Sequence, residues 1–176
     1  MTLDWLVIGG GIHGVHIAAS LIGEGKVDPG GIRILDPGQR LLERWRTCTE
    51  TTGMTHLRSP SVHNLDLSPW SLVEFAKDLK GDMPNLFAPP YDRPHLQLFN
   101  DHCDQVIQTF GLDKLHIRAR AVSCSLDCDA VTVELSNGTT VSAARVVLAM
   151  GAGEHPAWPE WAPEGDPRLS LSLIHI

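Results

Sequence analysis

The stretch DWLVIGGGIHG, residues 4–14, joins a short apolar run to three glycines at the spacing G-x-G-x-x-G. Trp5 to Ile8 fits a buried parallel strand, and the amphipathic run after the last glycine fits a helix. Gly9 permits the tight turn out of the strand, Gly11 leaves room for a pyrophosphate, and Gly14 lets the helix pack against the strand. The stretch therefore predicts a strand, a turn and a helix that together cradle the phosphates of a dinucleotide.

Such a cradle needs no cationic side chain, because the free N–H groups and the positive dipole end of a helix N-terminus attract anions. A purely structural turn between strand and helix is the alternative, since glycine-rich turns also occur without a ligand. His13 and His16 are interpreted as members of the cradle and of the first helix, and not as a general acid or base. We expect the whole turn to contact the cofactor: Gly9, Gly10, Gly11, Ile12, His13 and Gly14.

A second strand is predicted at Gly31 to Asp36, GIRILD, which ends in an acid. An aspartate at this point can accept hydrogen bonds from both ribose hydroxyls of an adenosine. The acid lies slightly later than the usual interval, and the extra loop Lys26 to Gly30 explains the delay. Together with the glycine turn, this acid favours a nucleotide site over a structural turn.

Composition limits the classes of partner and compartment. The chain has 176 residues, a net charge of −7 and no cluster of Lys or Arg, which argues against nucleic acid or an anionic membrane and favours a small-molecule substrate. No apolar run approaches transmembrane length, and the N-terminus carries Asp4 where a signal peptide has basic residues. Four cysteines without regular spacing indicate reduced thiols in a cytoplasm. Oligomeric state stays open.

After Asp36 the sequence predicts a turn and a short basic helix over Pro37 to Arg46, and then an irregular polar loop over Thr47 to Asp66. Among the arginines of the helix we expect one at most, Arg44, to reach the adenosine or pyrophosphate end of a cofactor; a solvated helix face is the alternative. Long loops inside compact domains are usually functional. We expect Met54 to Ser61 to line the reactive end of the cofactor, with Arg58 orienting an anionic group there or forming a plain salt bridge.

Two helices are predicted in the middle of the chain. Ser71 and Glu74 have the spacing of a capping box, which predicts a helix to Lys80 that stops at Gly81. His95 to Phe110 is amphipathic, and Cys103 belongs to its apolar stripe. Although histidines accompany this cysteine, no companion ligands recur at zinc-site spacing, so no metal is expected.

From Leu115 onward the apolar period becomes two. Four short strands are predicted as a β-meander, with a tight turn at Asn137-Gly138, and Arg145 to Met150 is predicted as a buried parallel strand that returns to the nucleotide-binding sheet. Cys124 and Cys128 lie about 13 Å apart in an extended strand, too far for a disulfide, so they are interpreted as structural. The four strands of the predicted meander are Leu115 to Arg118, Ala121 to Leu126, Ala130 to Ser136 and Thr139 to Ala143.

In this order the motifs resemble the FAD-binding half of two-dinucleotide-domain flavoproteins, most of all the flavin-containing and the lysine or ornithine N-hydroxylating monooxygenases. The motifs that carry the resemblance are GGGIHGVHIAA, the acid Asp36, the meander and the stretch VVLAMGAGEHPAWPEW. The resemblance implies an α/β, Rossmann-like FAD-binding domain with an inserted β-meander. It also implies that the glycine turn holds the pyrophosphate of FAD, Asp36 the ribose and the backbone of Val122 the adenine, and that Gly151 lies where the chain crosses between domains.

The activity that this resemblance implies is that of an FAD-dependent, NAD(P)H-using oxidoreductase of the monooxygenase type. Two alternatives remain: a non-catalytic module that binds FAD or NAD, and another flavin reductase or oxidase. A disulfide reductase is disfavoured for lack of a C-x-x-C dithiol. The loop MTHLRSPS, residues 54–61, lacks the amine-substrate residues expected of the family, so the substrate stays open.

The second cradle for NADPH and the segment that completes the FAD domain do not follow in this sequence. We therefore expect residues 1–170 to be an incomplete FAD-binding domain that is inactive alone. Residues 171–176, LSLIHI, resemble a translated transposon end from sequencing libraries, which predicts a foreign tail. A genuine edge strand is the alternative for this segment.

Overall fold

A computed structural model describes residues 2–79, 86–126 and 129–151, and a six-stranded sheet of order β5-β2-β1-β8-β7-β6 organises them. Strands β5, β2, β1 and β8 are mutually parallel, whereas β6, β7 and β8 form an antiparallel meander. This is the predicted Rossmann-like α/β fold with an inserted meander. The strand bounds are β1 Leu3–Ile8, β2 Ile32–Asp36, β5 His116–Arg118, β6 Ala121–Leu126, β7 Val131–Leu135 and β8 Thr140–Leu148.

Strand β8 corrects the prediction of two separate strands at its place. Its first half pairs antiparallel with β7, from Glu134↔Thr140 to Val131↔Ala143, and it pairs parallel with β1 from Leu3↔Ala143 to Ile8↔Leu148. No glycine or proline separates the two halves, so nothing ends the strand between them. One strand therefore closes the meander and returns the chain to the parallel sheet.

Strand β5 corrects a second prediction, because it lies outside the meander. It pairs parallel with β2, with His116 opposite Ile34, and forms the edge of the parallel sheet. Strand β5 has three residues, which are too few for the apolar period to distinguish an edge strand of the parallel sheet from a strand of the meander. The turn at Asn137-Gly138 is confirmed, with Gly138 at φ +80° and the N–H of Leu135 donating to the carbonyl of Thr139.

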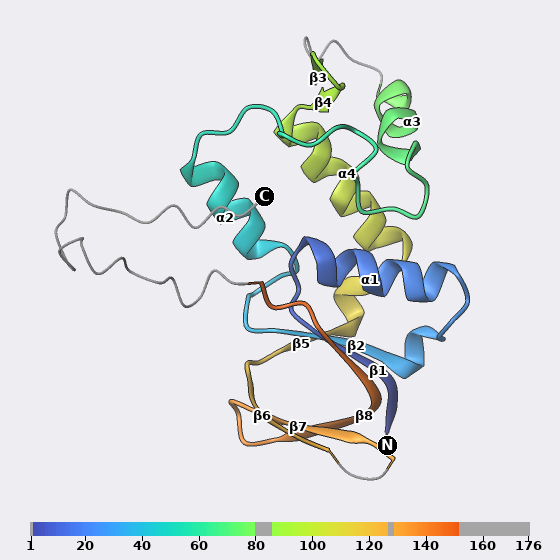
Figure 1. Cartoon of the computed structure of the whole chain (residues 1–176), viewed down its shortest axis with the longest axis vertical. Helices are drawn as coiled ribbons and strands as arrows, with labels where there is room; N and C mark the ends of the chain where they lie inside the picture. Colours follow the sequence, from blue (N-terminus) through green and yellow to red (C-terminus); the bar gives the residue numbers. More distant parts are fainter. Residues whose placement is uncertain (1, 80–85, 127–128, 152–176) are drawn as a thin grey trace, which may run out of the picture.

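The two faces of the parallel sheet have different covers. Val7 and Ile34 belong to one buried cluster with helices α1 (Ile12–Gly23) and α4 (Leu96–Thr109), while Leu6 and Ile8 pack with Leu135 of the meander. Alternate residues of a strand point to opposite faces, so the apolar run of β1 serves both cores. Figure 1 shows the resulting layers, with α1 and α4 on one side of the parallel strands and β6 and β7 on the other.

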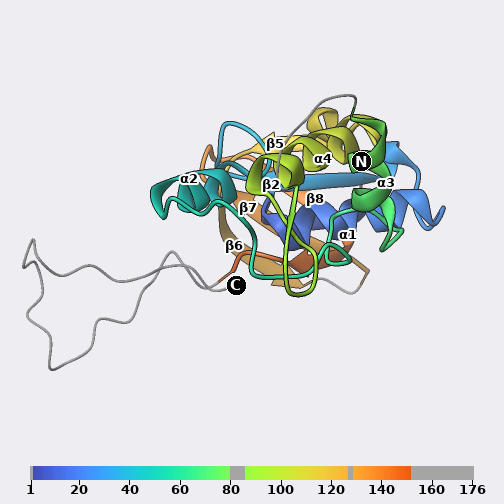
Figure 2. The ribbon, with the colours of Figure 1, turned by 90° about the horizontal axis from the view of Figure 1, so that it is seen from above.

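Helix α2 spans Glu43–Thr51 and so corrects the prediction of a turn and short helix over Pro37 to Arg46 followed by a loop from Thr47. Threonine is a poor helix former, yet two threonines support the last turns of α2. The hydroxyl of Thr49 donates to the carbonyl of Trp45 and that of Thr51 to the carbonyl of Thr47. Both views of the ribbon place α4 between α2 and α3 (Ser71–Asp78) (Figures 1 and 2).

Helix α3, Ser71–Asp78, is present as predicted, but the capping box is wrong. The N-cap residue is Trp70, and no side chain caps this end. The hydroxyl of Ser71 lies 2.9 Å from Nε2 of His102 and 3.2 Å from Oδ1 of Asn64, so tertiary contacts use the group that a capping box needs. Helix α4 agrees with its prediction, and Nδ1 of its N-cap residue His95 accepts from the N–H of Gln97.

Short elements complete the described chain: the 3-10 turns η1 (Pro29–Gly31) and η2 (Leu112–Leu115), and the small hairpin of β3 (Phe87–Ala88) and β4 (Arg93–Pro94). None of the described helices combines the length and the apolar character needed to cross a membrane. The predicted end of α3 at Gly81, Cys128 and the predicted tail 171–176 lie outside the described residues.

Candidate functional site

A cavity of about 420 Å³ opens where β1, β2 and β8 reach their carboxyl ends. Open α/β sheets bind their ligands at this edge, in the crevice beyond the strands. The floor is apolar, from Ile8 and Leu35, and the connection from β5 to β6 closes one side. The lining residues are Ile8, Gly9, Leu35, Asp36, Pro37, Ala119, Arg120, Ala121, Met150 and Gly151.

Two glycines of the turn are required by the fold itself. Gly9 has φ +114°, and a Cβ there would overlap the carbonyl of Ala149. A Cβ on Gly14 would overlap the carbonyl oxygen of Gly9, because α1 and β1 approach each other without a side chain between them. These two positions would need glycine even without a ligand.

Gly11 differs, because the protein itself does not require a glycine there. A Cβ at Gly11 would meet no atom within 4 Å, and the backbone has φ −80°, which any residue can adopt. The space in front of Gly11 is therefore open, as a pyrophosphate held against the backbone would require.

The N-terminus of α1 faces this space without compensation. Gly11 is its N-cap, no side chain caps it, and its first turn contains no acidic residue. The first backbone bond inside the helix is the N–H of Val15 to the carbonyl of Gly11, so the N–H groups of Ile12, His13 and Gly14 precede it. A helix end of this kind attracts phosphate. His13 is exposed on this turn, whereas Nδ1 of His16 lies 2.9 Å from the carbonyl of Leu65.

Asp36, at the end of β2, connects two loops of the site. Its Oδ2 accepts from the N–H of Gly10 at 2.7 Å, and its Oδ1 accepts from the N–H of Gly38 at 2.8 Å. An ionised carboxylate offers about four acceptor positions, so two remain for further donors. The residue lines the cavity and is half-buried, which leaves it within reach of a sugar hydroxyl.

The structure brings some of the other predicted residues to the cavity and not others. Gly151, with φ +69°, lines it. Arg44 and Arg58 are exposed on α2 and on the following loop, and neither lines the cavity. Val122 is 63% exposed, and the wall at this point is formed by the residues 119–121 just before it. The cofactor contacts of Arg44, Arg58 and Val122 stay predictions.

Among the seven lining residues that sequence reasoning missed, Ile8, Leu35 and Ala121 lie within strands, and the other four are Pro37, Ala119, Arg120 and Met150. They follow the ends of β2, β5 and β8, and the carboxyl ends of parallel strands meet at one edge. Strand ends were thus the signal that could have found them.

The loop Met54 to Ser61 lies beside the N-terminus of α4. The N–H of Leu57 donates to the carbonyl of Pro94, the N–H of Leu96 donates to the carbonyl of Thr55, and the rings of His56 and His95 are 5.1 Å apart. Leu57 is buried there. The loop does not line the cavity, so its proposed place beside the reactive end of a cofactor stays a prediction.

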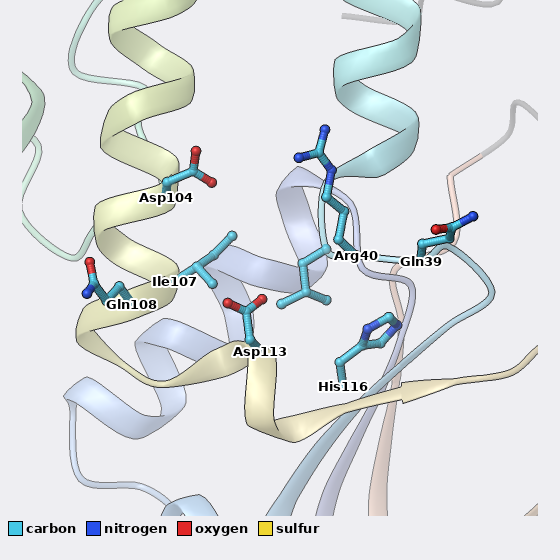
Figure 3. Close-up of a pocket in the computed structure, with 8 residues that line it drawn as sticks. Gln39, Arg40, Asp104, Ile107, Gln108, Asp113 and His116 are labelled. Atoms are coloured by element: carbon cyan, nitrogen blue, oxygen red, sulfur yellow. The ribbon is translucent and has the colours of Figure 1, made fainter.

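A larger cavity, of about 690 Å³, lies between the C-terminal half of α4, η2 and the loop after β2 (Figure 3). Asp104 and Asp113 stand on its walls with Arg40 and His116, and Figure 3 shows Arg40 extending toward α2. The carboxylate of Asp104 already pairs with Arg46 at 2.6 Å. The lining of this cavity includes no residue of the glycine turn, whereas Gly9 lines the smaller cavity, so the smaller cavity is the better dinucleotide site.

The described residues form no metal-binding cluster, and their cysteines lie on separate elements. Within residues 2–79, 86–126 and 129–151, no group of three or more His, Cys, Asp or Glu is placed to hold a metal ion. Cys103 is buried in the apolar stripe of α4, as expected, and burial raises the pKa of its thiol. Cys48 and Cys124 are free thiols on other elements.

Comparisons with known structures show the fold. A flavin-containing monooxygenase from Stenotrophomonas maltophilia matches with a TM-score of 0.59 and 22% identity over 90% of this chain and 41% of that chain. An oxidized steroid monooxygenase bound to NADP matches with a TM-score of 0.62 and 19% identity over 85% of this chain and 26% of that chain. A bacillithiol disulfide reductase from Staphylococcus aureus matches with a TM-score of 0.55 and 17% identity over 86% of this chain and 39% of that chain.

These structures are longer than the matched region, and the chain spans about two fifths of the flavin-containing monooxygenase. No curated protein matches the sequence significantly. The family described as FAD-NAD(P)-binding matches residues 6–153, which include the glycine turn, Asp36, the meander and the returning strand. With most of its length matched, the chain belongs to the FAD-NAD(P)-binding family.

Proposed function

We propose that the chain is the FAD-binding part of an NAD(P)H-using flavin oxidoreductase of the monooxygenase type. The observation that carries the proposal is one cavity bounded by the glycine turn at Gly9 and by Ala121, the first residue of the meander. A nicotinamide domain of the usual doubly wound type has no such antiparallel insertion before its returning strand. The meander therefore favours FAD over NAD in this cradle.

The residues of the cavity suit the parts of a dinucleotide. Of the glycine turn, Gly9 lines the cavity, and the backbone from Gly10 to Gly14, beside the open space in front of Gly11, would complete the pyrophosphate site. The remaining acceptor positions of Asp36 would bind ribose hydroxyls. The backbone between Ala119 and Val122 would face the adenine, and Gly151 would form the opposite rim. The floor of Ile8 and Leu35 excludes water beneath the nucleoside.

When bound, FAD supplies acceptance of hydride from NAD(P)H and reaction with oxygen. The likeness in fold to two monooxygenases, one of them bound to NADP, supports this type of reaction. Arg58 is the residue we propose to orient an anionic group of the substrate or of NAD(P)H, because it is exposed on the loop predicted to face the reactive end.

A disulfide reductase is the weaker candidate, although one of that activity shares the fold. Such chemistry needs two thiols in contact. Among the described residues the free cysteines are Cys48, Cys103 and Cys124, which belong to α2, α4 and β6, and Cys103 is buried.

Substitution of Gly11→Ala tests the cofactor site, since the added methyl meets no protein atom and would occupy the space of the pyrophosphate. Wild-type protein mixed with FAD and passed through gel filtration should retain flavin absorbance. The variant should lose the flavin and keep the thermal midpoint of the ligand-free protein. Gly30→Ala is the matched control, because a Cβ there also meets no atom within 4 Å and the position is remote from the cavity. A Gly11→Ala protein that retains as much flavin as wild type would contradict the assignment.

The monooxygenase type is tested by peroxide stoichiometry in the flavin-loaded oxidoreductase of which this chain would be the FAD-binding part. Consumption of NAD(P)H with oxygen and a nucleophilic amine or thioether should yield less peroxide than NAD(P)H consumed. Complete recovery of the consumed NAD(P)H as peroxide, with every substrate tried, would indicate an oxidase instead.

A further inference from the structure

Asp36 accepts three hydrogen bonds from the protein itself, and none of them depends on a bound ligand. The N–H of Gly10 donates to Oδ2 at 2.7 Å and the N–H of Gly38 donates to Oδ1 at 2.8 Å. From the other side, Nε2–H of His116 donates to the main-chain carbonyl of Asp36 at 3.0 Å. The carboxylate is therefore fixed between the glycine turn and the loop after β2.

Gly10 is held on both sides of its peptide. Its N–H reaches Asp36, and its carbonyl accepts from the N–H of Leu42 at 2.7 Å. A Cβ on Gly10 would lie 2.9 Å from Cβ of Asp36 and 2.9 Å from Cδ2 of Leu41, so the turn rests directly on the segment after β2. Gly10 is flanked by Gly9 and Gly11, whose backbone borders the space proposed for the pyrophosphate.

We propose that Asp36 is a positioning residue for the phosphate cradle, which it holds through Gly10, in addition to its contact with the ribose. The inference rests on the proposed function for the identity of the ligand. Hydrogen bonds from N–H groups to a carboxylate are among the stronger ones in proteins. One of them restrains the glycine turn, which lacks side chains of its own, and the other holds the carboxylate to Gly38 of the loop after β2. Loss of the carboxylate would then weaken the binding of phosphates that Asp36 does not touch.

The first experiment measures the ligand-free protein, so it does not depend on any cofactor. Asp36→Asn offers one acceptor oxygen where the carboxylate offers two, and its NH₂ group faces one of the two N–H donors. Amide hydrogen exchange at Gly10 or Gly38 should become about tenfold faster or more. Asp28→Asn is the matched control, because Asp28 is exposed at η1 and its side chain makes no cap hydrogen bond there.

Unchanged exchange at both amides in Asp36→Asn would overturn the inference. If this variant does not fold, the wild-type protein still decides. Protection of the Gly10 amide in the ligand-free state is expected, and exchange at the rate of an unprotected loop would overturn the inference equally.

The second experiment compares adenosine with ADP, which differ by the pyrophosphate. Loss of a ribose contact alone would weaken both ligands by the same factor. Loss of the cradle geometry should weaken adenosine about tenfold and ADP about a hundredfold, so that the preference for ADP falls about tenfold. Removal of a negative charge near the phosphates would by itself raise the preference for ADP, which is the opposite sign.

Titrations followed by NMR suit these weak ligands. An ADP preference that is unchanged or raised in Asp36→Asn would refute the positioning role, and Asp28→Asn should match wild type for both ligands. If wild-type protein binds neither adenosine, ADP nor FAD, the proposed function fails, whereas the exchange experiment still judges the restraint of Gly10 by Asp36.

Discussion

The packing of α1 against β1 requires a glycine at Gly14, whereas at Gly11 only a ligand in the open space would require one, although the same motif contains both. In Gly14→Ala the new methyl would overlap the carbonyl oxygen of Gly9, so α1 would have to move away from β1. We expect a loss of about 1–3 kcal/mol in the free energy of unfolding, measured by urea denaturation. Gly30→Ala, where a Cβ meets no atom, should stay within about 0.5 kcal/mol of wild type. Equal stability of the two variants would show that the helix adjusts freely.

His102 gives the stability a dependence on pH. Its side chain is fully buried against Phe75, and burial lowers its pKa, with Asp66 opposing the shift in part. Because the folded protein holds this histidine neutral while the unfolded chain binds a proton near its usual pKa of about 6.5, stability falls as the pH drops below that value.

The test of this pH dependence is His102→Gln, which keeps a partner for Ser71 and does not titrate. Its thermal midpoint should change less than that of wild type between about pH 8 and about pH 5. The control is His63, an exposed histidine of the loop before α3. His63→Gln should show the same change of thermal midpoint with pH as wild type. A wild-type slope in His102→Gln would assign the effect to other groups.

Helix α2 is attached to α4 through a side-chain hydrogen bond and an aromatic contact, both made by the half-buried Trp45. Nε1 of Trp45 donates to Oδ1 of Asn100 at 3.1 Å, and the rings of Trp45 and Phe99 are 5.6 Å apart. Asn100→Ala leaves the indole N–H without this acceptor and should cost about 1–3 kcal/mol of unfolding free energy. On the exposed side of α4, Gln97→Ala removes only the hydrogen bond to Asp101 and should lower the free energy of unfolding by about 0.2–0.5 kcal/mol. Equal urea midpoints for the two variants would contradict a role of this pair in holding α2.

Among the helices and strands, the sequence predicted correctly those that the apolar period or the turn residues determine. Strand β6 and helix α4 agree with their predictions within a residue or two, because a clear apolar period runs through each. Helix α2 was misplaced because a run of threonines has low helix propensity, while its hydroxyls bonding back to carbonyls depend on the helix being formed. The division of β8 into two strands was a boundary error at a point with no turn residue.

The candidate site as a whole was predictable only where one local motif contains it. Gly9, Gly11, Gly14 and Asp36 followed from spacing within a single strand–helix–strand unit. The wall at Ala119 to Ala121 depends on β5 pairing with β2 and on the meander turning back, which involve residues far apart in sequence. No local pattern reports such long-range pairing.

The whole molecule should report its cofactor through thermal stability, because a ligand that binds only the folded state raises the midpoint. At about 100 times its Kd, FAD should add about 2.7 kcal/mol to the free energy of unfolding, which corresponds to about 5–10 °C for a chain of this size.

NADP should shift the midpoint less than ADP at the same concentration, since its 2′-phosphate would lie against the carboxylate of Asp36, whose two oxygens already accept N–H groups. Gly11→Ala should abolish the shift with FAD and with ADP. A shift by NADP that equals the shift by ADP would mean that Asp36 does not face the ribose, and the adenosine would then have to be placed elsewhere in the cavity.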